Sequence, residues 1–275
     1  MQKINGSAEI DKILHHIMSE ELAPHTCQLF EREEPKTMKP YGSGVLAILN
    51  DNYYILTASH VVEDWSDEHQ LYIRYRKGYI SVVGTMSQTV VENQEKVDLA
   101  FIRLEPETIK YLLDGYKFLP ISKFRGHRNL LDAAQYCVIG FPEVNQRKDE
   151  KGVLRTGTSA YFMAPSKPKV YEYYKLKPEN HISLEFKGRG TDVLTGDVKK
   201  LSGNHYGLSG CGLWLILLTQ TEKGYDYDFR LIGIMTDFRR GKYDCLFGNR
   251  IEQLLMALKA FKLLDYKEVP INGYA

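Results

Sequence analysis

Short apolar runs alternate with polar or glycine-containing segments through the middle of the chain. The runs are rich in Val, Ile, Leu and Tyr, and each has about the length of one β-strand. In chain order they read GVLAIL, YYILTA, QLYIRY, ISVVGTM, LAFIRL, QYCVIGF, HISLEF, GLWLILL and RLIGIMT. Short strands at this regular spacing predict a β-sandwich or a β-barrel.

Helical periodicity is confined to the two ends of the chain. Apolar residues of segment 10–17 fall on one face of a helix that Ser7 could cap, and a second apolar stripe covers residues 251–263. Because each stripe needs a surface to cover, both helices are predicted to pack against the β-structure.

Size and charge narrow the class of protein. The chain has 275 residues, of which 43% are hydrophobic, so it can bury a large core as one large or two small domains. Its 36 Lys and Arg residues nearly balance 35 Asp and Glu residues. Global charge therefore gives no reason to expect nucleic acid or an anionic membrane as a partner.

Two absences in the sequence bear on location and cofactors. No apolar stretch approaches the about 20 residues that span a bilayer, and the N-terminal segment has no signal-peptide pattern. The four cysteines lie far apart, and Glu63 and His69 have no metal-ligand spacing beside His60. These features predict a cytoplasmic protein with reduced thiols, no metal and no other cofactor.

Three polar residues stand at the edges of predicted strands. His60 follows a strand in YYILTASHVV, Asp98 enters one in EKVDLAFIRL, and Ser209 lies on a tight turn in GLSGCGLW. A serine hydroxyl is a poor nucleophile until a base takes its proton, and a histidine base needs an acid to fix its tautomer. Each residue alone also fits a structural role, but together they supply the three parts of a nucleophilic site.

Chain order separates this set from two other classes of serine hydrolase. An α/β-hydrolase needs its histidine after the nucleophile, whereas all eight histidines precede Ser209. The G-x-S-x-G elbow also fails, because position 211 is Cys. A subtilisin order would need an acid before His60, but Asp51 in LNDNYY is predicted to be a hairpin-turn residue.

Five segments in order resemble the trypsin-like, or chymotrypsin-fold, serine peptidases. They are GSGVLAIL, TASH with His60, DLA with Asp98, GLSG with Ser209 and LIGIMT, over about residues 42–237. The unpaired cysteines and the segment QYCVIGFP are most similar to the bacterial HtrA-like subset. The resemblance implies an all-β fold of two six-stranded antiparallel barrels with the active site between them, and we expect short helices at both ends.

The resemblance and the helical stripes divide the chain into four segments. These are residues 1–39 as N-terminal helix and lead-in, 40–128 as first barrel with His60 and Asp98, 129–248 as second barrel with Ser209, and 249–275 as C-terminal helix and tail.

The resemblance also assigns roles to site residues. Ser209 would be the nucleophile, His60 the general base and Asp98 the orienting acid. The N–H groups of Gly207 and Ser209 could form an oxyanion hole, because a bulky residue at 207 would hinder the tight turn. The Thr236 hydroxyl would bond Asp98 and support the triad.

The predicted substrate pocket departs from the family pattern. Gly203 stands where an acid would select Lys or Arg, and Phe238 replaces a glycine that keeps such pockets open. Asp237 and Phe238 would line the edge and mouth of the pocket, so small P1 residues are expected. The alternative is that both belong to an exposed turn. His205 either lines the pocket or lies in a surface loop.

Two further departures concern the segment around the serine. Leu208 replaces the aspartate that pairs with a newly cut N-terminus in secreted enzymes, so activation by that pairing is not expected. Cys211 replaces the second glycine after the serine and is expected to be a small packed thiol.

The predicted function is a serine endopeptidase that hydrolyses protein or peptide substrates through an acyl-enzyme. A cytosolic peptidase with no inhibitory pro-segment would need control, which favours a regulatory protein partner. The alternative is a catalytically silent module that keeps the fold and holds a peptide strand by edge pairing. Neither function involves nucleic acid or a membrane.

Overall fold

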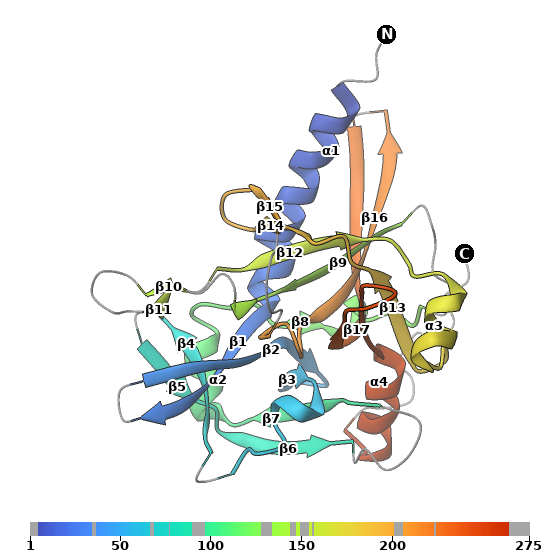
Figure 1. Ribbon diagram of the computed structural model, residues 1–275. Coiled ribbons are helices and arrows are strands. Elements are labelled where there is room, and N and C mark those ends of the chain that lie inside the picture. The colour runs from blue at the N-terminus through green and yellow to red at the C-terminus, as the bar shows by residue number, and fades with distance from the viewer. Residues whose placement is uncertain are drawn as a thin grey trace.

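A computed structural model gives the fold of the chain (Figure 1). The residues that it describes are 5–34, 37–66, 69–76, 78–89, 97–127, 134–143, 147–148, 154–155, 157–200, 206–222 and 224–263.

The first half of the chain forms a strongly curled sheet, the first half-barrel. Seven of its eight strands follow one antiparallel path in the order β5-β4-β1-β2-β3-β7-β6, and β8 pairs parallel with β2. The strands are β1 (Thr26–Glu34), β2 (Thr37–Leu49), β3 (Asn52–Thr57), β4 (Leu71–Tyr75), β5 (Gly78–Ser81), β6 (Gly84–Gln88), β7 (Ala100–Leu104) and β8 (Leu119–Pro120). Helix α2 (Pro106–Leu112) and the 3₁₀ turn η3 (Ser59–Val61) lie in the connections between them, and the 3₁₀ turn η4 (Ile121–Lys123) follows β8.

The second half-barrel is an antiparallel sheet of eight strands in the order β13-β18-β17-β16-β9-β12-β14-β15. Its strands are β9 (Gln135–Gly140), β12 (Ser159–Met163), β13 (His181–Glu185), β14 (Arg189–Asp192), β15 (Val198–Lys200), β16 (Gly212–Thr221), β17 (Gly224–Arg239) and β18 (Cys245–Arg250). Helix α3 (Pro168–Tyr174) precedes β13, and β10 (Arg147–Lys148) with β11 (Leu154–Arg155) forms a separate two-stranded ladder.

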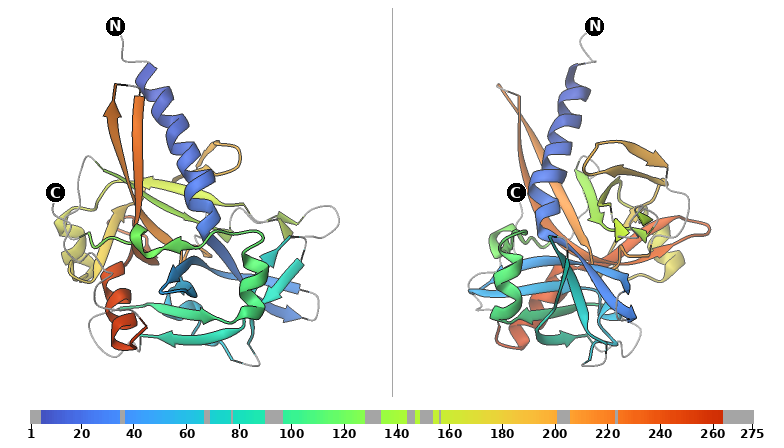
Figure 2. Two further views of the ribbon diagram at one scale, coloured as in Figure 1. Left: turned by 180° about the vertical axis from the view of Figure 1, so that it is seen from behind. Right: turned by 90° about the vertical axis from the view of Figure 1, so that its left-hand side faces the viewer.

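Both predicted terminal helices are present. Helix α1 (Asn5–His16) continues into the π-helical turn η1 (Ile17–Leu22) and the 3₁₀ turn η2 (Ala23–His25), and it lies beside the long β16–β17 hairpin (Figures 1 and 2). Helix α4 (Ile251–Ala260) follows β18 directly. Ser7 lies inside α1, so the predicted cap at Ser7 is wrong.

One hydrophobic cluster joins the terminal helices to both half-barrels. Leu22 of η1, Tyr54 of β3, Trp214 of β16 and Leu258 of α4 all belong to it and are fully buried. Because this shared core fixes the half-barrels against each other, side chains from the two can meet in one rigid site.

The predicted chymotrypsin-like fold is confirmed as two curled antiparallel half-barrels with terminal helices. Each sheet contains eight strands rather than the expected six. The first half-barrel also begins before residue 40, because β1 pairs with β2 and β4. Asp51 is confirmed as a hairpin residue, since Asn50 and Asp51 join β2 to β3 with φ of 46° and 59°.

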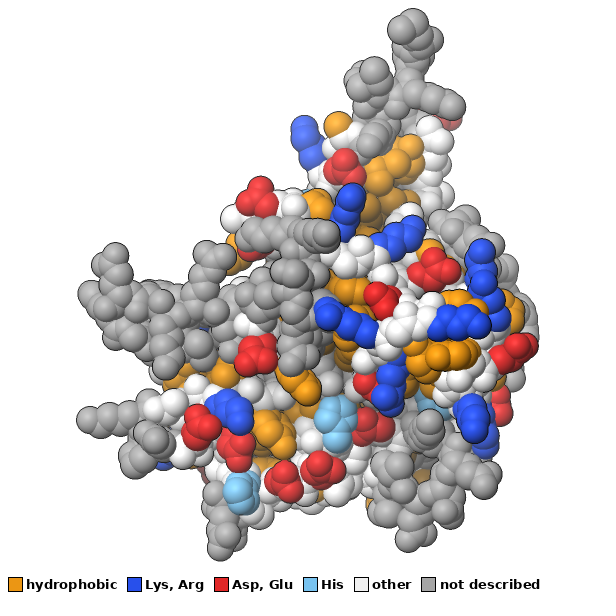
Figure 3. Space-filling model, viewed as in Figure 1, with side chains coloured by type: hydrophobic (Ala, Val, Ile, Leu, Met, Phe, Trp, Pro, Cys, Tyr) orange, Lys and Arg blue, Asp and Glu red, His pale blue; other side chains and the backbone are white. Residues whose placement is uncertain are grey.

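Two broader features of the described residues bear on function. No helix among them is long and apolar enough to cross a membrane. On the face seen in Figure 3, Asp and Glu side chains gather beside and below a central histidine, and Lys and Arg side chains gather at mid-height on the right-hand side.

Candidate active site

His60 is held at the end of the apolar strand β3. The turn η3 carries it, and the turn is anchored on one side by Ser59, whose hydroxyl donates to Gln88 Oε1 at 3.0 Å. On the other side Thr57 Oγ1 donates to the Ser43 carbonyl at 2.8 Å. His60 thus leaves the sheet at a fixed point, and its side chain is 42% exposed.

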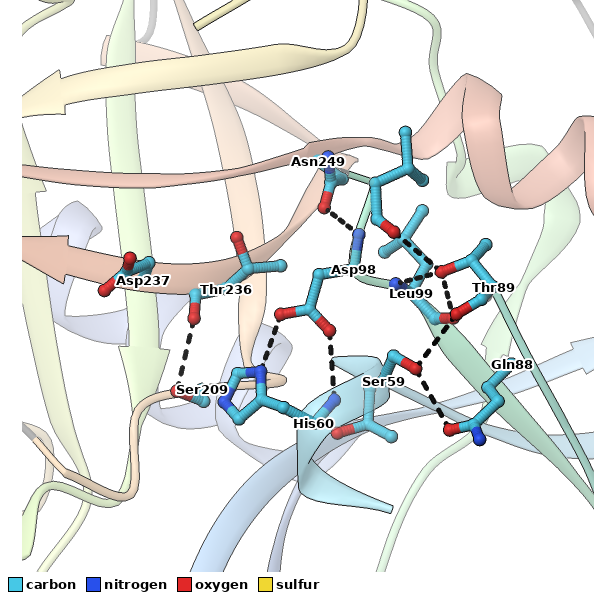
Figure 4. Close-up of polar contacts among 12 residues, drawn as sticks. Ser59, His60, Gln88, Thr89, Asp98, Leu99, Ser209, Thr236, Asp237 and Asn249 are labelled. Atoms are coloured by element: carbon cyan, nitrogen blue, oxygen red, sulfur yellow. Dashed lines mark hydrogen bonds and ion pairs between the residues drawn. The ribbon is translucent and has the colours of Figure 1, made fainter. Parts of the chain in front are cut away.

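Asp98 forms hydrogen bonds to His60 through both of its carboxylate oxygens (Figure 4). Its Oδ2 lies 2.6 Å from His60 Nδ1, and its Oδ1 accepts the His60 backbone N–H at 3.0 Å. The Asp98 side chain is 22% exposed. Its own backbone N–H donates to Oδ1 of the fully buried Asn249 at 2.8 Å, which ties the loop before β7 to β18.

This arrangement sets the electrostatics of the imidazole. The hydrogen bond to Asp98 raises the pKa of His60, with further increases from the charges of Asp98, Glu63 and Asp237, while burial opposes them. Donation from Nδ1–H to the carboxylate leaves Nε2 as the basic nitrogen of the neutral ring. Figure 4 shows the ring between Asp98 and Ser209, with its second nitrogen on the serine side.

We expect the imidazole of His60 to titrate with a midpoint above the ordinary histidine pKa of about 6.5. The hydrogen bond to Asp98 stabilises the protonated ring, so His60 stays protonated to higher pH. Asp98→Asn removes the largest cause of the rise, so an NMR titration of His60 in that variant should have a lower midpoint. An unchanged midpoint would contradict this account of the shift.

Ser209 lies in a tight turn directly before β16 and shares a pocket with His60. Its Oγ donates to the Thr236 carbonyl at 3.4 Å, a long hydrogen bond (Figure 4). The pocket has a volume of about 460 Å³ and crosses the boundary between the half-barrels. Its lining residues are Tyr41, His60, Val61, Glu63, Tyr206, Gly207, Ser209, Met235, Asp237 and Phe238.

The serine turn has a conformation that depends on two glycines. Gly207 has φ of +91°, and a Cβ there would clash with the Phe141 carbonyl oxygen. Gly210 has φ of +88°, and a Cβ there would clash with the Ser43 carbonyl oxygen and Thr57 Oγ1. Both turn positions therefore require glycine.

Ser43 of β2, in the opposite half-barrel, holds the serine turn by hydrogen bonds. Sequence reasoning missed this role. The Ser43 N–H donates to the Ser209 carbonyl at 2.8 Å, and its Oγ donates to the Gly207 carbonyl at 2.6 Å. Within the described part of the chain, the N–H groups of Gly207 and Ser209 have no hydrogen-bond acceptor. Ser43 therefore binds only the carbonyl groups of Gly207 and Ser209. The N–H groups of these two residues stay free to bind a ligand oxygen.

The prediction for the Thr236 hydroxyl is wrong. Thr236 lies at a β-bulge of β17, where the register against β18 shifts between Met235 and Asp237. The bulge turns the Thr236 carbonyl toward Ser209, while the hydroxyl donates to the Phe247 carbonyl at 3.4 Å. The hydroxyl thus bonds β18 rather than Asp98.

Asp237 and Phe238 line the pocket, as expected, and they lie on β17 rather than in an exposed turn. Asp237 Oδ1 accepts the Phe238 N–H at 2.7 Å, and Asp237 Oδ2 pairs with Arg239 Nη2 at 2.6 Å. Burial raises the pKa of Asp237, and the charge of Arg239 opposes this shift. The Phe238 ring packs edge-to-face on Phe186, with centroids 5.0 Å apart.

Four further residues were singled out in the sequence, and the structure describes two of them. Leu208 and Cys211 are fully buried in the core of the second half-barrel, so Cys211 is confirmed as a packed thiol. Gly203 and His205 lie outside the described residues. Among the residues that are described, His, Cys, Asp and Glu side chains form no group of three that could bind a metal ion.

Part of the chain is similar to a known protein family. Residues 42–177 match the family model of the trypsin-like peptidase domain, and no curated protein matches the chain. The matched segment contains His60 and Asp98 and runs from β2 into the second half-barrel. Residues 42–177, just under half of the 275-residue chain, are thus similar to a trypsin-like peptidase domain, and this match ends before Ser209.

Proposed function

We propose that the chain is a serine endopeptidase in which Ser209 is the nucleophile, His60 the general base and Asp98 the orienting acid. The observation that carries this proposal is the imidazole of His60, bonded through Nδ1 to Asp98 at 2.6 Å and facing Ser209 with its other nitrogen (Figure 4). A pocket that takes residues from both half-barrels leaves room for a peptide beside the two side chains.

Each step of the reaction has a group to carry it. Ser209 Oγ attacks the peptide carbonyl carbon and passes its proton to His60 Nε2. The N–H groups of Gly207 and Ser209 bind the oxyanion of the tetrahedral intermediate. Its collapse breaks the C–N bond, and the leaving amine takes the proton from His60. A water molecule, deprotonated by His60, then hydrolyses the acyl-enzyme and releases the acid.

One observation favours the alternative, a catalytically silent module that binds a peptide strand. Ser209 Oγ donates to the Thr236 carbonyl and not to His60 in this structure. In the peptidase reaction the hydroxyl must rotate from Thr236 to His60 before attack. Hydrogen bonds at catalytic sites commonly tighten only when substrate binds, so the peptidase stays our first proposal.

Cleavage profiling of a cell lysate separates the two functions. Wild-type protein should generate new peptide N-termini that Ser209→Ala and His60→Ala do not generate. Ser122→Ala, on the exposed turn η4, is the matched control and should cleave as wild type. Cleavage that survives Ser209→Ala would overturn the catalytic assignment, and a profile with no new N-termini would favour the binding module.

Three finer parts of the proposal rest on the sequence alone. The HtrA-like subset, the cytoplasmic location and a regulatory protein partner stay predictions.

We expect Phe238→Gly to broaden the P1 preference from small residues to larger ones. The Phe238 ring lines the pocket and leans on Phe186, so its removal opens space beside Ser209. The measurement is kcat/KM across peptides that differ only at P1. Phe261→Gly, at the exposed end of α4, is the control. An unaltered preference, or a wild-type preference for Phe, Tyr or Arg, would contradict the obstructed pocket.

A further inference from the structure

Strand β17 offers an open edge next to Ser209. Its pairing with β16 ends at Ile234, whereas β18 covers its other edge through Arg239. The ladder with β16 thus stops short of residues 236–239, which follow on β17. An extended peptide can therefore add to this edge by main-chain hydrogen bonds, with its reacting carbonyl at Ser209.

Cationic side chains continue from this edge onto the second half-barrel. The Arg240 guanidinium lies over the ring of Phe238, 5.4 Å from its centroid, and that ring lines the pocket. The Lys242 ammonium lies 5.6 Å from the ring centroids of both Tyr173 and Tyr243. Aromatic rings thus hold Arg240 beside the pocket and Lys242 on the β17–β18 turn.

Two acids lie among these cations, and both are engaged by neighbouring groups. Asp237 is paired with Arg239 at 2.6 Å, and Asp244 Oδ1 accepts the Gly241 N–H at 3.2 Å. Over residues 237–244, at the end of β17 and in the β17–β18 turn, three cations, Arg239, Arg240 and Lys242, thus outnumber these two acids, which gives this segment a net positive charge.

The opposite side of the pocket is acidic. Glu63 and Tyr41 line it from the first half-barrel, and Tyr41 Oη donates to Asp64 Oδ2 at 3.4 Å. Burial raises the pKa of Tyr41, and the charges of Asp64, Glu31 and Glu63 raise it further. On the face seen in Figure 3, acidic side chains gather beside and below a central histidine, and basic side chains lie above it and to its right.

The chemistry of acyl transfer determines which half of a substrate lies against each side of the pocket. The acyl half stays bonded to Ser209 and lies along β17, whereas the leaving amine must receive its proton from His60. His60, Glu63 and Asp64 all belong to the first half-barrel. Residues before the scissile bond therefore face the cations, and residues after it face the acids.

We propose that the pocket selects peptides with acidic residues before the scissile bond and basic residues after it. The proposal deepens the proposed function and rests on it for the direction of the substrate. Complementary charge on both halves attracts the correct order and repels the reversed one, so the order of charges, rather than their number, decides recognition.

Peptide binding tests this preference without requiring cleavage. We would use fluorescein-labelled peptides of identical composition on Ser209→Ala protein, with three Glu, a central Ala-Ala and three Lys in either order. Fluorescence anisotropy should give about 10-fold tighter binding for the acid-first peptide at low salt, and the difference should shrink as salt rises. Equal affinity for the two orders would overturn the proposal.

Charge-reversal variants identify the residues that produce the preference for charge order. In the Ser209→Ala background, Glu63→Lys with Asp64→Lys, or Arg240→Glu with Lys242→Glu, should each weaken the order preference, and all four together should invert it. Glu107→Lys with Lys110→Glu, on the exposed face of α2, is the matched control and should leave it unchanged. A preference that survives all four reversals would overturn the proposal.

The two proposals fail in different ways. Selective acid-first binding to Ser209→Ala, without cleavage by wild type, would defeat the peptidase and retain the charge preference. Cleavage by wild type with no dependence on charge order would retain the peptidase and defeat the charge preference.

Discussion

Replacing Asp98 with Asn is expected to lower turnover about 10⁴-fold while the fold is retained. The carboxylate accepts both the Nδ1 and the backbone N–H of His60. An amide that donates to Nδ1 would instead place the imidazole proton on Nε2, where it could no longer accept the Ser209 proton. The measurement is kcat on a responsive peptide, with circular dichroism to verify folding.

Asp226→Asn is the matched control for this change. Asp226 pairs with Thr219 in the β16–β17 hairpin, away from the pocket, so its variant should turn over as wild type. A folded Asp98→Asn protein that keeps more than about one tenth of wild-type turnover would contradict the role of Asp98 in fixing the tautomer.

Gly207→Ala is expected to lower turnover about 10²- to 10³-fold, the usual effect of losing one oxyanion donor. Gly207 has φ of +91°, and a Cβ there would clash with the Phe141 carbonyl oxygen, so the turn must move. Movement would displace the N–H groups of Gly207 and Ser209, which the proposed mechanism assigns to the oxyanion. The measurement is kcat with KM, because a pure oxyanion effect changes kcat and leaves KM nearly constant.

Gly188→Ala separates the oxyanion effect from general backbone strain. Gly188 also has a positive φ, of +67°, but a Cβ there would meet no atom within 4 Å. Its alanine variant should lose some stability and keep its turnover. Equal losses of turnover in both variants would mean that strain, rather than the oxyanion donors, explains the Gly207 result.

The local features of the site were readable from the sequence. His60 follows the apolar strand β3, and Asp98 precedes the apolar strand β7. The pairing of β3 with β7 places those two strand ends side by side. The glycines around Ser209 signalled a tight turn because few other residues adopt a positive φ. Motif order then supplied a fold in which the three segments converge.

The supporting contacts were not readable because they join distant parts of the chain. The Ser43 hydroxyl and the Gly207 carbonyl are 164 residues apart, and Asp98 and Asn249 are 151 apart. Neither Ser43 nor Asn249 has a local pattern that distinguishes it from a turn or strand-end residue. The Thr236 hydroxyl was misplaced for a related reason, since the bulge depends on the register between β17 and β18.

Missed elements of the fold have similar causes. Strand β1 buries its first half, Thr26 to Phe30, but ends in the charged residues Glu31, Arg32, Glu33 and Glu34, which hide its strand pattern. Helix α3 has seven residues, too few for apolar periodicity to show. It is fixed by burial of Val170 and Tyr171 against β18, a contact that only the fold reveals.

Labelling with a fluorophosphonate probe, followed by peptide mapping in a mass spectrometer, tests the central claim most directly. Such a probe phosphonylates a serine only when a base activates it and donors hold the oxygen bound to phosphorus. The account predicts one adduct, on Ser209, that is absent from Ser209→Ala and forms far more slowly in His60→Ala. An unlabelled Ser209 in folded wild-type protein, or labelling that His60→Ala leaves unchanged, would contradict it.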